Sequence, residues 1–188
     1  QDAAHRAHVY QHPHDHKEDG DHEVVDAHQV LFNDAVAALQ RGDLNTAEVD
    51  FKKALELNPD LIQAHGALAT IYHGLAKWEE AVASIESLPR GPMPPQLAPV
   101  AFDAYRRTGD MKKANEALAA VQDASIRRSL AEGVYDDGVA YSDIANMGEA
   151  RRHFELALEV DPTIVVPHRS LAALEFNEQE FEAALPHL

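Results

Sequence analysis

The sequence predicts an all-α protein, a right-handed superhelical solenoid of about 4.5 helix-turn-helix repeats that follows a polar N-terminal arm. The main observation is a series of near-repeats about 34 residues apart, clearest where GDLNTAEVDFKKALELNP (42–59) is echoed by GEARRHFELALEVDP (148–162). Composition agrees, because 45% of the 188 residues are hydrophobic but only 6% are aromatic, as expected for closely packed Ala and Leu helices. Such units cannot bury their apolar faces alone, so they are expected to stack.

The first unit is predicted at residues 28–61, with Gly42 at the turn between its two helices. Small side chains let antiparallel helices approach closely, and an aromatic ring fills the space beside them. A proline then ends the second helix, since its ring cannot continue the hydrogen-bond pattern. These positions are held by Ala47, Phe51, Ala54 and Pro59.

Four further units follow the same pattern, and the last is predicted to stop inside its second helix. Five prolines between Pro89 and Pro99 predict a stiff, extended connection after the second unit. A second irregular junction is predicted at 122–131. The predicted units after the first are 62–94, 95–130, 131–164 and 165–188, and together with residues 28–61 they form one domain behind an arm at 1–27.

This spacing of small, aromatic and proline positions resembles the tetratricopeptide repeat family over about 160 residues. The resemblance implies a protein–protein interaction scaffold, which binds a protein or peptide in a groove lined by the first helix of each repeat. By position, the groove residues would be Phe32, Val36, Leu39, Gln63, His73, Asp103, Arg106, Arg107, Tyr135, Val139 and Asp143.

One subfamily clamps the C-terminal carboxylate of heat-shock chaperones with Lys and Asn on the first helix of its first repeat. Here the matching positions are Phe32 and Val36, whose side chains have no hydrogen-bond donor, so the resemblance disfavours that role. Arg106 and Arg107 remain candidates for gripping an acidic ligand. The alternative is that these adjacent cations are simply solvated.

Seven of the twelve histidines lie in the first 28 residues. In an extended chain His12, His14 and His16 share one side, and imidazole with carboxylate suits a divalent transition metal such as Zn, Ni or Cu(II). The alternatives are a disordered polar arm and a pH-sensitive one, since histidines titrate near neutral pH. No cofactor is otherwise required. The candidate ligands are His5, His8, His12, His14, Asp15, His16, Asp19, Asp21 and His22.

The net charge of −16 argues against nucleic acid or an anionic membrane as a partner, because both would repel the chain. No apolar run approaches the roughly 20 residues that cross a bilayer, so membrane insertion is not expected. The absence of cysteine excludes disulfides and thiolate chemistry. A start at Gln1 favours a periplasmic or extracellular protein whose signal peptide has been removed, with a cytoplasmic location as the alternative.

Catalytic motifs are missing: there is no glycine-rich phosphate loop, no nucleophile elbow and no His-Glu-x-x-His, so no enzyme is predicted. The predicted solenoid ends are apolar, whereas terminal repeats of soluble solenoids usually end in polar caps. A head-to-tail contact between such ends gives a filament unless it closes into a ring. A self-assembled structural subunit and an exported metal-binding protein therefore stay open as alternatives to the scaffold. The assembly-end residues are Val30, Leu31, Phe181, Leu185 and Leu188.

Overall fold

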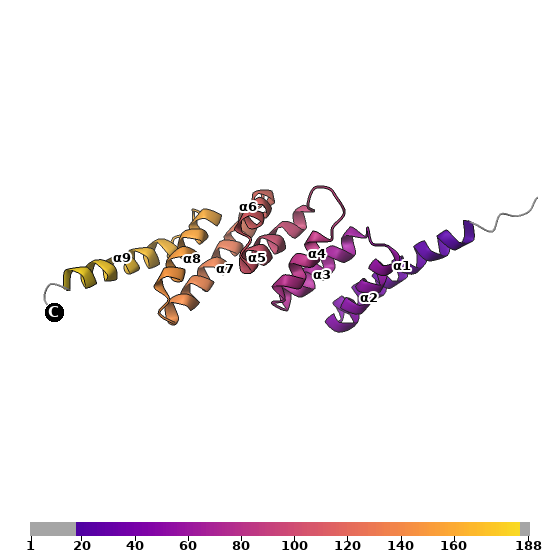
Figure 1. The fold of residues 1–188 in the computed structure, drawn as a ribbon, viewed down its shortest axis with the longest axis horizontal. Coiled ribbons are helices and arrows are strands. Elements are labelled where there is room, and N and C mark those ends of the chain that lie inside the picture. Colours follow the sequence, from indigo (N-terminus) through magenta and orange to yellow (C-terminus); the bar gives the residue numbers. More distant parts are fainter. Residues whose placement is uncertain (1–17, 185–188) are drawn as a thin grey trace, which may run out of the picture. The chain divides into compact units, whose positions relative to one another are not determined.

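A computed structural model describes the backbone of residues 18–184 and the side chains of residues 27–176. Over this part of the chain the regular structure is entirely helical, which confirms the all-α class (Figure 1). The chain divides into two compact units, Gln1–Leu68 and Ala69–Leu188, and each is described by itself. None of the described helices is both long and apolar enough to span a membrane.

Unit 1 is built on the hairpin of α1 (Glu18–Gln40) and α2 (Leu44–Leu57), and α3 (Ile62–Gly74) begins at its end. The small residues of the repeat pattern allow the close approach that the sequence predicts, since Ala47 and Ala54 are fully buried. Between them lies the buried ring of Phe51, edge-on to Phe32 at a centroid distance of 5.5 Å.

Unit 2 contains two complete hairpins, α5 with α6 and α7 with α8 (Figure 1). In addition α4 packs on α5, α5 on α7, and α9 on α8. The chain from Ser87 to Pro94 has no helix, as its prolines predict. The elements after α3 are α4 (Trp78–Glu86), the short 3-10 helix η1 (Pro95–Leu97), α5 (Ala98–Thr108), α6 (Met111–Ala120), α7 (Ala124–Asp143), α8 (Met147–Val160) and α9 (Val166–Ala184).

The turns that follow α1, α3, α5 and α7 share one geometry. Each has a residue in the left-handed region, at Gly42, Ala76, Gly109 and Ala145. The next backbone N–H donates to a carbonyl five residues back in every case, for example from Asn146 to Tyr141 at 2.9 Å. This pattern satisfies carbonyls that the ending helix leaves free. Two turns use alanine, which pays a steric cost that glycine avoids.

Arg127 braces the second half of unit 2. Its guanidinium and Nε atoms donate to the carbonyl oxygens of Leu118 and Val121 at the end of α6, at 3.2 and 3.0 Å. A third hydrogen bond of 3.1 Å reaches the carbonyl of Val160 at the end of α8. One cation therefore neutralises the negative ends of two helices, and it fixes the start of α7 between them.

Three boundaries differ from those predicted. α1 begins at Glu18, inside the predicted arm. α7 is continuous through the predicted boundary at 130/131, because Asp123 caps its N-terminus and no proline interrupts it. α9 is one continuous helix where a hairpin had been expected, since residues 166–184 contain no turn residue equivalent to Gly42.

Candidate binding surfaces

An ion network centred on the buried side chain of Arg106 joins α3, α5 and α7. His73 on α3 contacts Asp103 on α5, with 2.9 Å between Nε2 and Oδ2. Arg106, also on α5, reaches Asp137 on α7 at 2.7 Å, and it pairs with Asp103 as well. Arg107 pairs with the same two carboxylates. The side chain of Arg106 is only 5% exposed, so its charge is matched inside the protein rather than by water.

The network shifts the pKa values of Asp103 and Arg107. Burial opposes the charge of Asp103, but the hydrogen bond from His73 and the charges of Arg106 and Arg107 outweigh it, so the pKa of Asp103 lies far below its ordinary value. For Arg107, burial is likewise outweighed by Asp103 and Asp137, and its pKa is raised. Within the described residues, Nε of Arg106 is buried without a hydrogen-bond partner, which costs about 1–3 kcal/mol.

Trp78, the single tryptophan of the chain, lies beside this network at the start of α4. The guanidinium carbon of Arg107 is 4.7 Å from the centre of its ring, a cation–π distance. The His73 ring meets it edge-on at 5.4 Å. The indole is therefore held between two members of the network.

A large cavity of about 990 Å³ opens next to Trp78 and Arg107. Its walls come from α4, α5, α6, α7 and α8, and from the turn that carries Gly109. The apolar part of the lining is Trp78, Met111, Ala140, Tyr141, Ile144 and Leu156, and the charged part is Arg106, Arg107, Asp137, Glu149, Arg152, Glu155 and Glu159.

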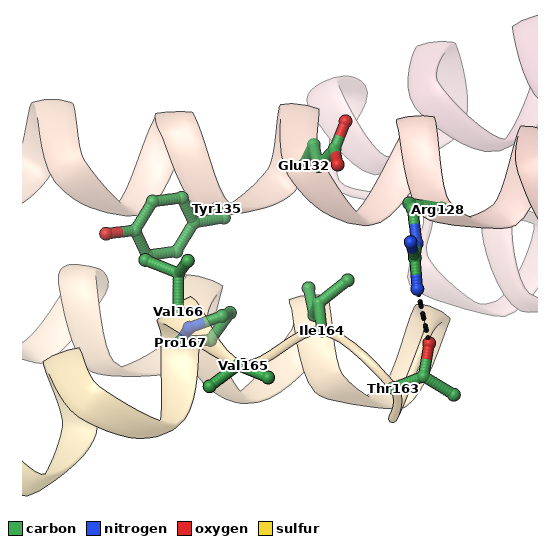
Figure 2. A pocket seen from close by; sticks show the side chains of 8 residues that line it. All are labelled: Arg128, Glu132, Tyr135, Thr163, Ile164, Val165, Val166 and Pro167. Carbon is green, nitrogen blue, oxygen red and sulfur yellow. Dashed lines mark hydrogen bonds between the residues drawn. The ribbon is translucent and has the colours of Figure 1, made fainter.

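A smaller cavity of about 270 Å³ lies between α7 and the connection from α8 to α9. Figure 2 shows three side chains of α7 on one side and residues 163–167 on the other, with the ring of Tyr135 directly above Val166. Arg128 closes one end through a 3.1 Å hydrogen bond to the hydroxyl of Thr163. The cavity is lined by Arg128, Glu132, Tyr135, Thr163, Ile164, Val165, Val166 and Pro167.

The predicted groove residues divide between the units. His73, Asp103, Arg106 and Arg107 are brought together as the ion network, and Tyr135 lines the smaller cavity. The idea that Arg106 is a solvated cation or a free grip for an acidic ligand is wrong, because burial and two carboxylates neutralise it. The other predicted groove residues, which the structure also describes, do not take part in the network. Val139 and Asp143 lie on α7. The remaining ones belong to unit 1, with Phe32, Val36 and Leu39 on α1 and Gln63 at the start of α3.

Sequence reasoning missed three kinds of residue. One is Asp137, although an acid less than two helical turns before the end of α7 is a natural partner for cations on a neighbouring first helix. Glu155 and Glu159 looked like ordinary exposed acids in a chain with 32 of them. Val165 and Val166 are a pair of exposed apolar residues at the start of α9, and adjacent apolar residues at a helix start were the signal for this surface.

Two predicted sites fall mostly outside the described side chains. All nine candidate metal ligands lie at residues 5–22, so the metal site stays a prediction; among the side chains described, no group of three His, Asp or Glu residues is placed to hold a metal ion. Of the assembly ends, Val30 is 57% exposed on α1 and Leu31 is half-buried. The side chains of Phe181, Leu185 and Leu188 are outside the described part.

These hairpins and cavities define a helical-repeat protein with binding surfaces. Residues 38–91 match the family model of the tetratricopeptide repeat. Similar solved structures are a MamA protein (15% identity over 85% of this chain and 87% of that one, TM-score 0.54) and MamA 41-end from Desulfovibrio magneticus RS-1 (18%, 86% and 91%, 0.53). A tetratricopeptide repeat protein from Parabacteroides merdae is also similar (22%, 86% and 65%, 0.52). No curated protein matches.

The family match covers residues 38–91 alone. At these sequence identities the structural neighbours establish the fold alone. This fold agrees with the all-α repeat architecture that the sequence predicts.

Proposed function

We propose that this chain is a non-enzymatic scaffold that binds a peptide segment of a partner protein at the smaller cavity of unit 2. The observation that carries the proposal is the exposed apolar surface beside Tyr135, where Val165 and Val166 are 59% and 52% exposed. A volume of about 270 Å³ accommodates one or two partner side chains. Burial of one large apolar side chain there would contribute about 1.5–3 kcal/mol.

The cavity is also pre-formed, which lowers the entropic cost of binding. The ring of Tyr135 packs on Phe154 at 5.2 Å, and its hydroxyl lies 3.2 Å from that of Ser170. Arg128 and Glu132 place one charge of each sign beside the apolar floor. Such a surface favours an apolar anchor side chain whose flanking backbone and polar groups meet the charged residues.

The test is selection of displayed random peptides on the purified protein, followed by affinity measurements on variants. Val165→Asp with Val166→Asp places charges on the apolar floor and is expected to weaken the selected peptides at least about tenfold, since an anchor would then be buried against unpaired charge. Val49→Asp with Ile62→Asp, at similarly exposed positions of unit 1, is the matched control and is expected to leave affinity unchanged. Equal affinity of both double variants would refute the proposal.

Self-association is a second candidate, favoured by Phe176, which is 59% exposed on α9. A large exposed aromatic ring is a common element of protein interfaces. Sedimentation velocity over a wide concentration range tests it. Phe176→Ser is expected to shift the protein toward monomer, whereas Ile126→Ser, on another exposed helix position, is not. A wild-type chain that is monomeric throughout the range rules this candidate out.

A further inference from the structure

We propose that the large cavity of unit 2 is a second binding surface, and that it takes a basic segment of a partner protein whose lysine or arginine side chains pair with Glu155 and Glu159. This surface is separate from the smaller cavity, with which it shares no lining residue. The proposal therefore stands or falls independently of the one above.

The large cavity has an apolar lining that is partly exposed. Ile144 is 71% exposed and Met111 is 37% exposed, and both lie on the cavity wall. Trp78, Tyr141 and Leu156 extend this surface inward. Exposed apolar surface with a polar rim is typical of binding sites on soluble proteins. The volume of about 990 Å³ is large enough for several residues of a peptide rather than one side chain.

The charged side chains of the cavity wall favour a basic partner. Arg106 and Arg107 are matched by Asp103 and Asp137, and the third wall cation, Arg152, pairs with Glu149 at 2.6 Å. Among the described side chains, the wall charges that these pairs leave are the carboxylates of Glu155 and Glu159, both exposed on α8.

These two carboxylates are one helical turn apart, and like charges at that spacing repel each other. A cation bound between them would relieve the repulsion. The neighbouring His153 directs its Nδ1 to the backbone oxygen of Glu149, at 2.9 Å. An acidic partner, in contrast, would find every arginine of the wall already paired. Charge and apolar surface together select a segment that is both basic and apolar.

The position of Trp78 gives a direct readout. It is the only tryptophan in the chain, and it lines the cavity, so its fluorescence reports occupancy without any label. The probe is a synthetic peptide of alternating leucine and lysine, which contains no aromatic residue. The comparison peptide has glutamate in place of lysine. We expect a saturable change in Trp78 emission with the lysine peptide and none with the glutamate peptide.

Two double variants separate the cavity from the overall charge of −16. Glu155→Gln with Glu159→Gln is expected to weaken the lysine peptide about 3- to 10-fold, because exposed ion pairs contribute about 0.2–1 kcal/mol each. Glu56→Gln with Glu116→Gln changes the net charge equally at exposed helix positions outside the cavity, and it is expected to keep wild-type affinity. Both are surface substitutions, and circular dichroism checks that each variant is folded.

Three results would overturn the inference. They are equal weakening by the two double variants, which indicates attraction by net charge alone; a glutamate peptide that binds as well as the lysine peptide; and unchanged Trp78 emission throughout the titration. The variant with Val165→Asp and Val166→Asp is expected to keep the Trp78 response. That result distinguishes a failure of the smaller cavity from a failure of the large one.

Discussion

Gly138 on α7 is predicted to be a position where a single methyl group is not tolerated. A Cβ atom built there would lie 2.7 Å from two ring carbons of Phe154 and 3.1 Å from the Cβ of His153. The Phe154 ring is 3% exposed and is packed against Tyr135, so it has little room to move. Gly138→Ala therefore forces α7 and α8 apart. Gly133, on the same helix, has no atom within 4 Å of the equivalent position.

The two substitutions form a matched pair. Each replaces glycine by alanine inside one helix, so each gains about 1 kcal/mol of helix propensity. That gain cancels in the comparison, which leaves the packing cost at Gly138, about 1–3 kcal/mol for a forced methyl group in a close-packed core. Gly133→Ala is accordingly expected to be more stable than wild type.

Thermal and urea unfolding followed by circular dichroism measure the difference. With about 2–4 °C per kcal/mol for a chain of this size, Gly138→Ala should melt roughly 2–12 °C below Gly133→Ala. Equal melting temperatures of the two variants would contradict the close contact between Gly138 and Phe154.

Four further predictions concern the ion network, the hydrogen bonds of Arg127 and the turn at Ala145. Asp103→Asn should destabilise unit 2 by about 1–3 kcal/mol in urea unfolding, because the buried Arg106 loses one of its two half-buried carboxylate partners. The pKa of Asp103 is lowered on folding, so its contribution is complete above the ordinary value of 3.8 and is lost as pH falls through the lower folded value; the gap between wild type and Asp103→Asn should shrink below pH 3.8. Arg127→Met should cost at least about 2 kcal/mol by leaving three helix-end carbonyls without their donor, whereas Arg128→Met, at an exposed side chain, should cost under about 1 kcal/mol. Ala145→Gly should raise the melting temperature, since alanine there has a φ of 60°.

The sequence predicted what depends on local rules. The positions of Ala47, Phe51 and Ala54 required only that small and aromatic side chains recur on one face of a helix, and all three are buried. Gly42 and Gly109 mark turns because glycine tolerates a positive φ. The alanine turns at Ala76 and Ala145 carry no such composition signal, and only the repeat spacing indicated them.

The surfaces were less accessible to prediction, because they depend on which long side chains meet. Placing His73, Asp103, Arg106 and Arg107 on one line of first helices needed only the repeat register, and that line is where the network forms. Whether they would face solvent or one another depended on Asp137, about 30 residues farther along the chain. A neutral side chain at that position would leave Arg107 without one of its two carboxylates.

The network also gives a physical reason for the large cavity. Where two helices pack through short apolar side chains, their backbones approach closely and leave no space. α5 and α7 instead meet through Arg106, Arg107 and Asp137, which are long or charged and bond at their tips. The same three side chains line the cavity beside Trp78, so that space is bordered by long or charged groups and not by closely packed short ones. Buried ion pairs add little net stability compared with apolar packing. Because these pairs connect α5 to α7, we expect them to keep this wall of the cavity in a fixed position.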